Sequence, residues 1–380
     1  MRFAIDATAI TVGGGVTYMR NLLLALAQVD RENEYWIYLS SHQTRLKLDL
    51  PLNFHVNRVQ FPEPRVIWRV LWQQIVLPSV LRQLKIEVLL APFEIAPLLS
   101  PCQIILEIQN QNPYFGPPET GLDRIRLIAL RVLTRFSASK ASKVFFVSDY
   151  SRRLIAPMIG LKEEKTAVIY HGVDEQFFST NLRLFPEAIE TLTAEPYILS
   201  VSNVRVHKDY ATLIKAFRYL LESTGQNLKL IIAGPIIDLR YFKGLEDLVQ
   251  RLGLMGYVDF IGEVPYEKMP GLYQRALIFV LPSLAETFGL PLIEAMASGI
   301  PVIASDLPVT REVCGQAAYY FRPGDALDLA QKLDILLSNQ ETRQALIQAG
   351  LLQARRFSWH HTASMLLELL TEVASSKGVK

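Results

Sequence analysis

Several features that mark common classes of protein are scarce in this 380-residue chain. Its 2 cysteines, Cys102 and Cys314, are too few for a disulfide scaffold or a cysteine-based zinc site, and they suit a reducing compartment. The 39 basic and 37 acidic residues give a net charge of +2, which creates no overall field for a polyanion, so we expect no nucleic-acid partner. No apolar run reaches about 18 residues, and the apolar start MRFAID is too short for a signal peptide. The sequence therefore predicts a cytoplasmic protein that neither spans a membrane nor is exported by that route.

What the chain does contain is a regular alternation of short β-rich runs and helical periods. A length of 380 residues, half of them hydrophobic, exceeds the roughly 250–300 residues at which one core stops growing. The near-continuous apolar strands favour parallel sheets that are buried on both faces. Strands are predicted at residues 2–6, 34–40, 86–92, 103–108, 143–148, 196–202, 228–234, 258–264, 277–283, 301–305 and 317–321, and the main helices at 16–28, 66–84, 122–136, 209–224 and 292–298.

The predicted fold is α/β, with two facing Rossmann-like domains and a cleft between them. We place the first domain at residues 1–178 and a polar, proline-containing linker at 179–196. The second domain then covers 197–357, and residues 358–380 form a C-terminal helix that crosses back to the first domain.

In open parallel sheets, ligands bind at the carboxyl ends of the strands. In the first half, Gly13, Gly14 and Gly15 follow the first strand and precede a helix that begins near Val16. Glycines at such a place let the backbone approach a phosphate or sugar closely. Their spacing does not match the G-x-G-x-x-G motif of dinucleotide-binding folds. The alternative is that these glycines form a turn that binds no ligand.

In the second half, the segment AETFGLPLIEAMASGIPVIAS carries two acids, Glu286 and Glu294, in a neighbourhood almost free of charge. The alternative without a functional role is that Glu286 is solvated and that Glu294 only interacts favourably with the dipole at a helix N-terminus. However, the segment is too apolar to be a solvent face, so we expect Glu294 to point into the cleft. A carboxylate there can accept hydrogen bonds from the hydroxyl pair of a ribose or sugar.

These residues resemble a known family. The segment SLAETFGLPLIEAMASGIPVIASDLP looks like the signature of retaining, nucleotide-sugar-dependent glycosyltransferases of family 4, which have the GT-B fold of two facing Rossmann-like domains. The likeness covers nearly the whole chain, since FVSDYSRRLI, VIYHGVDEQFF, YILSVSNVRVHKDYATLIKAF, FIGEVPYEKMPGLYQRA and ARRFSW are similar to the family at the corresponding places. The element with two glutamates is the more specific part of the match.

The resemblance implies a role for each matching position. Glu286 corresponds to the glutamate near the donor sugar and the reaction centre, Glu294 to the one that holds the nucleotide ribose, and Lys208 to the lysine that neutralises the diphosphate. Main-chain amides at the helix start bind the sugar hydroxyls and the diphosphate. The resemblance gives the donor site as Glu294, Phe288, Gly289, Leu290, Asn203, Arg205 and Val264.

The chain departs from the family pattern at two places. Many members have Gly-Arg where this chain has Ser202-Asn203, so Arg205 or His207 would have to replace that arginine. Many also carry a His-Asp pair near the reacting sugar, where this chain has Gln109 and Asn110. Neither amide is a general base, although both can hydrogen-bond a sugar hydroxyl.

The resemblance implies a retaining glycosyltransferase that moves a hexosyl group from a nucleoside diphosphate sugar to a hydroxyl of a glycan or lipid-linked acceptor. GDP-mannose is the first choice of donor and a UDP-sugar the second. The absence of any Asp-x-Asp motif predicts a metal-independent enzyme, with no cofactor besides the co-substrate. The alternatives are a nucleotide-sugar epimerase and a non-catalytic relative that binds nucleotide sugars.

A stripe of arginines on one predicted helix suggests where in the cell the protein acts. Arg124, Arg131 and Arg135 are spaced by seven and four residues, so they share one face of a helix. With Trp68 and Trp72 they could form a basic, aromatic surface against anionic lipid at the inner face of the plasma membrane. The alternative is the solvated edge of a buried helix.

Overall fold

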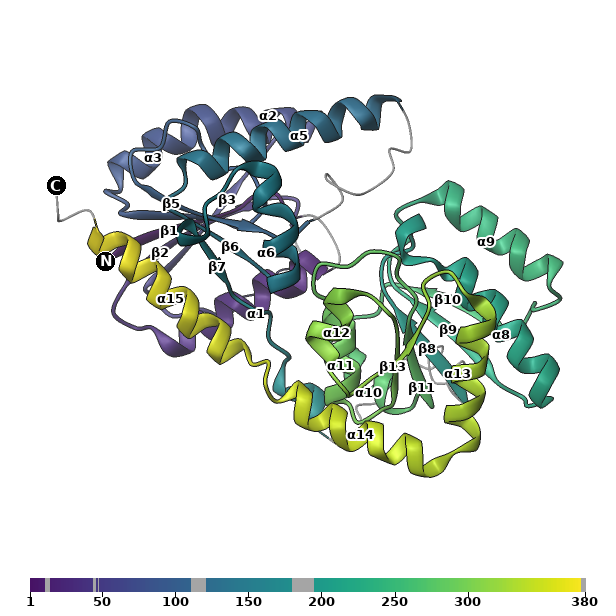
Figure 1. The fold of residues 1–380 in the computed structure, drawn as a ribbon. Helices are drawn as coiled ribbons and strands as arrows, with labels where there is room; N and C mark the ends of the chain where they lie inside the picture. Colours follow the sequence, from purple (N-terminus) through teal and green to yellow (C-terminus); the bar gives the residue numbers. More distant parts are fainter. Residues whose placement is uncertain (11–13, 44–45, 47, 111–120, 180–194, 377–380) are drawn as a thin grey trace. The chain divides into compact units, whose positions relative to one another are not determined.

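The computed structural model describes residues 1–10, 14–43, 46, 48–110, 121–179 and 195–376, apart from the side chains of residues 121–124. Two compact units make up the chain (Figure 1). The first comprises Met1–Gly172 together with Trp359–Lys380, and the second comprises Val173–Ser358. Residues 180–194 of the predicted linker lie outside the described residues, and the boundary between the units precedes that linker.

The first unit is built on a seven-stranded sheet of order β3-β2-β1-β4-β5-β6-β7. Every adjacent pair of its strands is parallel. Its strands are β1 (Arg2–Ala7), β2 (Glu34–Ser40), β3 (Phe54–Val59), β4 (Val88–Ala91), β5 (Gln103–Ile108), β6 (Lys143–Phe146) and β7 (Thr166–Val168).

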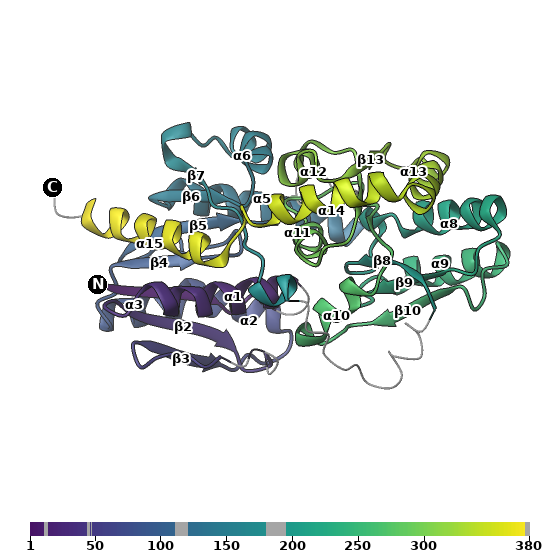
Figure 2. The ribbon, with the colours of Figure 1, turned by 90° about the horizontal axis from the view of Figure 1, so that it is seen from below.

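Helices cover both faces of this sheet because right-handed crossovers in opposite directions place them on opposite sides. Figures 1 and 2 show α1 and α15 on one face and α2, α3 and α5 on the other. Helix α15 packs along α1, although the two lie at opposite ends of the sequence. The helices of this unit are α1 (Gly14–Val29), α2 (Arg65–Leu71), α3 (Leu77–Gln83), α5 (Gly121–Lys140), α6 (Asp149–Ile155) and α15 (Trp359–Ser375), with a π-helical turn at Trp72–Val76 between α2 and α3.

The second unit has a six-stranded parallel sheet of order β10-β9-β8-β11-β12-β13. Helices α8, α9 and α13 enclose a large apolar core on one face, and α14 packs against α11 elsewhere in the unit. The strands are β8 (Tyr197–Val201), β9 (Lys229–Ala233), β10 (Val258–Gly262), β11 (Ile278–Leu281), β12 (Val302–Ser305) and β13 (Tyr319–Phe321). The helices are α8 (Tyr210–Thr224), α9 (Leu239–Arg251), α10 (Met269–Gln274), α11 (Leu290–Ala297), α12 (Pro308–Cys314), α13 (Ala326–Ser338) and α14 (Gln340–Ala354).

The predicted α/β fold with two parallel-sheet halves is confirmed, and each predicted strand is present within a few residues. Strands β3 and β7 were not predicted. Both lie at edges of the first sheet, and β3 exposes most of its side chains, so neither shows the apolar run of a buried strand. The predicted helix 66–84 is interrupted by the π-helical turn.

Candidate functional site

The site in the second unit lies where β8 and β11 end side by side. These strands are neighbours in the sheet, and the strand order reverses between them. A reversal of this kind leaves a crevice at the carboxyl ends of the two strands, which is the usual ligand position in such sheets. The following loops are tied together, since the main-chain N–H of Leu284 donates to the carbonyl of His207 at 2.8 Å.

Lys208 and Glu286 meet in this crevice. Lys208 closes the short 3₁₀ turn Val206–Lys208, and its Nζ donates to Glu286 Oε1 at 2.6 Å. Their side chains are only 14% and 9% exposed. Ser283 Oγ donates to the same carboxylate oxygen at 2.7 Å. Glu286 is therefore a buried, paired carboxylate, and the interpretation of a solvated surface acid is wrong.

The loop after β8 holds further nitrogen groups. Burial lowers the pKa of His207 to about 4, with Lys208 adding to the effect, so this ring is neutral at pH 7. Arg205 lies in the same loop, and its Nε is buried with no hydrogen-bond partner among the described residues. Of the two substitutes considered for the missing family arginine, Arg205 is thus the one that carries a charge. Asn203 is half-buried in this loop, and Val264 is buried after β10.

Helix α11 begins as the sequence predicts. Gly289 is its N-cap residue, with a φ of 91°, and Pro291 is in the first turn. This left-handed backbone favours glycine, and a Cβ there would lie 2.8 Å from Leu292 Cδ1, so the leucine side chain would also have to shift. Phe288 is buried against Phe357, with ring centroids 5.6 Å apart. Pro291 has no N–H and the Leu292 N–H donates to the Gly289 carbonyl at 2.9 Å, so Leu290 is the residue of the first turn whose N–H can bind an anion.

Glu294 lies in α11 and is 7% exposed. The hydroxyl of Tyr273, from α10, donates to Glu294 Oε2 at 2.9 Å. Burial raises the pKa of Glu294 to about 7. Its carboxyl is therefore enclosed and has a protein donor on one oxygen, and that it points into the cleft stays a prediction. Tyr273 carries no signal in the sequence that would have marked it.

In the first unit, Gln109 and Asn110 follow β5 directly. Their main-chain N–H groups both donate to Glu94 Oε1, at 3.2 and 2.8 Å. Glu94 follows β4, is 7% exposed, and burial raises its pKa to about 7. It was not among the predicted residues, although its place just after an apolar strand could have marked it.

A second buried carboxyl lies beside them. Glu107, in β5, is fully buried and accepts the hydroxyl of Tyr18 on Oε2 at 2.6 Å. Burial raises the pKa of Glu107 well above its ordinary value, and the negative charge of Glu94 adds to the shift. The side chain of Gln109 acts in the opposite direction and lowers the pKa of Glu107. However, Gln109 Nε2 and Glu107 Oε1 are both buried without a hydrogen bond of good geometry among the described residues.

The glycine cluster is described in part. Gly13 lies outside the described residues, and helix α1 starts at Gly14, two residues earlier than predicted. A Cβ on Gly14 would meet nothing within 4 Å, and one on Gly15 would make ordinary contact with the Phe93 ring at 3.7 Å. Packing within the described part of the protein therefore does not require glycine at either position.

The predicted basic, aromatic surface is also present only in part. Trp68 is 46% exposed, and Arg131 and Arg135 of α5 are exposed. Trp72 is half-buried and packs against the core beside Tyr38, with ring centroids 5.6 Å apart, so only part of its side chain is exposed. The side chain of Arg124 lies outside the described residues.

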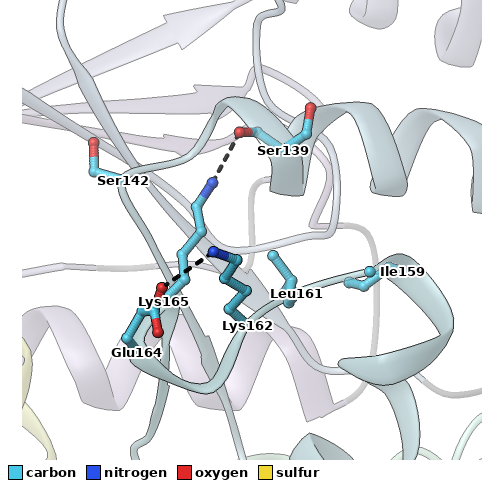
Figure 3. A pocket seen from close by; sticks show the side chains of 8 residues that line it. Ser139, Ser142, Ile159, Leu161, Lys162, Glu164 and Lys165 are labelled. Carbon is cyan, nitrogen blue, oxygen red and sulfur yellow. Dashed lines mark hydrogen bonds and ion pairs between the residues drawn. The ribbon is translucent and has the colours of Figure 1, made fainter.

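A separate pocket of about 430 Å³ lies near the C-terminal end of α5, as Figure 3 shows. Both lysines that line it already have protein partners. Lys165 Nζ donates to the Ser139 carbonyl at 2.8 Å, and Lys162 forms an ion pair with Glu164 at 3.8 Å. The pocket contains none of the predicted site residues. Across the described ranges, no group of three His, Cys, Asp or Glu residues is placed to hold a metal ion.

Two family models match the chain. One, glycosyl transferases group 1, matches residues 185–353, and the other, glycosyltransferase family 4, matches residues 12–177. The O-antigen chain mannosyltransferase B of Escherichia coli is 27% identical over 61% of this chain and 61% of its own length. The O-antigen chain mannosyltransferase RfbU of Salmonella typhimurium is 32% identical over 58% of this chain and 57% of its own length. The chain thus spans about three fifths of these curated relatives.

Solved structures support the same fold. Anabaena HepE, in complex with UDP and glucose, superimposes with a TM-score of 0.75, with 98% of this chain and 100% of that chain covered. Its sequence is 19% identical, so this likeness concerns the fold alone. The two family models together account for most of both units, and the two-sheet architecture agrees with them. The chain belongs to the GT-B glycosyltransferases, with a family 4 first half and a group 1 second half.

Proposed function

We propose that the protein transfers a hexosyl group, with retention, from a nucleoside diphosphate sugar to a hydroxyl of a glycan or lipid-linked acceptor. The observation that carries this proposal is the pair of Lys208 and Glu286 at the crevice between β8 and β11, beside the start of α11. This arrangement offers one cation, one carboxylate and a helix N-terminus to the same small region. The second unit would hold the donor and the first unit the acceptor.

The chemistry follows from charge. A leaving nucleoside diphosphate gains negative charge as the glycosidic bond breaks, so a fixed ammonium stabilises the transition state more than the ground state. Lys208, Arg205 and the main-chain amides at the start of α11 would supply that stabilisation without a metal ion. Glu286 holds Lys208 in place and would hydrogen-bond the sugar hydroxyls. The leaving phosphate itself would deprotonate the acceptor.

Glu294 would bind the ribose of the nucleotide. Its carboxyl is enclosed in α11 and accepts a hydrogen bond from Tyr273, so one oxygen is fixed by the protein. The remaining oxygen would accept from a ribose hydroxyl. Phe288, Gly289 and Leu290 would contribute main-chain amides, and Asn203 and Val264 would line the donor site.

Mannose from GDP-mannose is the proposed donor, and the product would belong to a cell-surface polysaccharide or glycolipid. Two relatives named as O-antigen mannosyltransferases support this choice. A UDP-sugar is the second candidate, supported by the UDP and glucose in the HepE complex.

The experiment is an assay of binding, hydrolysis and transfer with a panel of nucleotide sugars and glycan or polyprenyl-linked acceptors. We expect Lys208→Ala and Glu286→Ala to abolish transfer while both variants remain folded. Conversion of the donor in the absence of any acceptor would indicate an epimerase. Tight binding of one donor without turnover, unchanged in Glu286→Ala, would indicate a non-catalytic relative and contradict the proposal.

We also propose that the protein works at the inner face of the plasma membrane. The proposed contact is peripheral. Within the described ranges no helix is both long and apolar enough to span a bilayer. Helices α2 and α5 lie on the same face of the first sheet, and α2 buries none of its residues (Figure 1). Residues 65–83 and 125–140 contain no acid. Exposed apolar side chains lie between their arginines: Val66, Ile67, Trp68, Leu71, Ile75, Val76, Ile125, Ile128, Val132 and Phe136.

Exposed apolar side chains among cations fit an anionic bilayer surface. In co-sedimentation with phosphatidylglycerol-containing vesicles, we expect Trp68→Glu and Phe136→Glu to reduce binding at least about fivefold, because each places a charge where apolar contact is needed. Leu352, 72% exposed on α14, provides the control as Leu352→Glu. Equal binding by all three variants would contradict the membrane contact.

A further inference from the structure

Glu94 has an unusual backbone for its residue type. Its φ is 57°, in the left-handed region, and it is one of three non-glycine residues in the described part of the chain with positive φ. Such a conformation is strained for a glutamate and persists only where surrounding contacts impose it. Residues in this state often lie at functional sites, and Glu94 lies at the carboxyl end of β4, the strand next to β1 where the strand order of the first sheet reverses.

Three hydrogen bonds join Glu94 to the end of β5. Its main-chain N–H donates to the Glu107 carbonyl at 3.2 Å. Its Oε1 accepts the main-chain N–H groups of Gln109 and Asn110. The left-handed turn allows this because it brings both the backbone and the carboxyl of Glu94 to the neighbouring strand end. The backbone direction of Gln109 and Asn110 is therefore set by a side chain from another loop.

The Gln109 side chain has donor capacity left. It lowers the pKa of the neighbouring Glu107, but neither its buried Nε2 nor Glu107 Oε1 has a hydrogen bond of good geometry among the described residues. Leaving a buried donor or acceptor unsatisfied is destabilising. A sugar hydroxyl, which both donates and accepts, satisfies two such groups at once.

We infer that Glu94 is a positioning residue for the transfer reaction, which fixes the main chain of Gln109 and Asn110 so that their side-chain amides hydrogen-bond sugar hydroxyls at this end of the first sheet. This inference rests on the proposed function. Glu94 itself would not touch the sugar. Its effect would be geometric, because a catalytic amide displaced by about 1 Å loses much of its contribution to the transition state.

The experiment compares three substitutions of Glu94 in the full-length protein. Glu94→Leu removes the acceptor, and we expect kcat to fall about 10–100-fold while the Kd for the nucleoside diphosphate stays within about twofold. Glu94→Gln keeps an oxygen that accepts both N–H groups, so its kcat should stay within about threefold of wild type. Glu94→Asp tolerates the left-handed backbone but withdraws the carboxylate by one methylene, so an intermediate kcat is expected even if the leucine variant fails to fold.

Glu87 supplies the matched control. Its carboxylate also accepts a main-chain N–H, from Arg2 at 2.7 Å, but it lies just before β4, at the opposite end of that strand. Glu87→Leu should leave kcat unchanged. If the wild type transfers sugar and Glu94→Asp or Glu94→Leu keeps a normal kcat, the inference alone is wrong. If the folded wild type transfers no sugar, the proposed function and the inference both fail. Loss of kcat in Glu94→Gln equal to that in Glu94→Leu would also overturn the inference.

Discussion

At the scale of single residues, the site depends on charges that are almost out of water. The charges of Lys208 and Glu286 neutralise each other, and Ser283 donates a further hydrogen bond to the carboxylate. A paired ion in such a place adds little net stability, whereas a single remaining charge is costly. In the proposed reaction Lys208 would keep Glu286 as a partner, because its ammonium has two further N–H groups for a diphosphate.

This gives a prediction for stability. Lys208→Met leaves Glu286 buried without its cation and should lower the free energy of unfolding by about 2–4 kcal/mol, somewhat less than for a fully enclosed pair. The double variant Lys208→Met with Glu286→Gln should recover at least half of that loss, because no charge remains. Denaturant unfolding of the wild type, Lys208→Met, Glu286→Gln and the double variant measures the coupling energy between the two side chains. Additive losses would show that the two side chains do not interact.

A second prediction concerns Glu294, whose pKa is raised by burial to about 7. A carboxyl with a raised folded-state pKa contributes its full stability below its ordinary pKa, and that contribution is lost as the pH rises towards about 7. Glu294→Gln removes the titration, so its stability relative to wild type should increase between about pH 4.5 and 7, by up to about 3 kcal/mol, and then level off. Thermal unfolding across this range measures the difference, and a constant difference would contradict the burial of a titrating group.

Some of these residues could be predicted from the sequence. Glu286 and Glu294 were predicted from one local and specific motif, and Lys208 from a separate segment that resembles the family, and their roles stay predictions. The pairing of Lys208 with Glu286 was not, since it joins loops 78 residues apart. Glu94 and Tyr273 escaped notice for a similar reason, because their partners come from other elements and their own surroundings in the chain carry no motif.

At the scale of elements, the π-helical turn Trp72–Val76 determines which way two glutamines point. Gln73 is buried, and its Nε2 donates to Asp6 Oδ2 at 2.6 Å and to the Ile95 carbonyl at 2.9 Å. Gln74 hydrogen-bonds Ala96 and Leu98. π-Turns often mark functional regions, and this one secures the carboxyl end of β1 and the loop that contains Glu94.

We therefore expect Gln73→Leu to destabilise the protein by about 1–3 kcal/mol, because the buried Asp6 carboxyl loses a donor. Gln74→Leu is the control, since Gln74 has no charged partner and should cost less. Urea unfolding compares the two variants. Equal losses would mean that the contact with Asp6 contributes nothing specific.

Element-scale predictions from the sequence were accurate where apolar periodicity was strong, as in β2 and β5, whose bounds were predicted to the residue. They failed at β3, which pairs with β2 but exposes most of its side chains. They also missed the π-turn, because the apolar period continues through it. Backbone hydrogen bonding, not side-chain pattern, distinguishes these features.

At the scale of the whole molecule, the chain passes from one unit to the other twice. The two passages are joined at the bridge between Val173 and Ser358, where the Val173 N–H donates to the Phe357 carbonyl at 3.2 Å. Beyond it, Trp359 begins α15 and packs against Tyr18 and His171, with ring centroids 5.9 Å away in each case. The aromatic cluster thus fastens the last helix to the first.

Trp359→Ala should therefore destabilise the first unit by about 3–5 kcal/mol, as expected for deleting a buried aromatic side chain. Trp68→Ala, at the exposed side chain of α2, should cost less than about 1 kcal/mol. Hydrogen exchange resolves the effect by region, with faster exchange in α1 and α15 than in α8 and α13. Uniform acceleration in both units would contradict this assignment.

The joining of α15 to α1 has a consequence for synthesis on the ribosome. The nascent first unit emerges early, but its α1 face stays uncovered until α15 leaves the exit tunnel, after the entire second unit has been translated. A stop codon placed between the second unit and α15 would therefore damage the first unit, not the second. The second unit, whose sequence is continuous, can complete its core while the first is still waiting for its last helix.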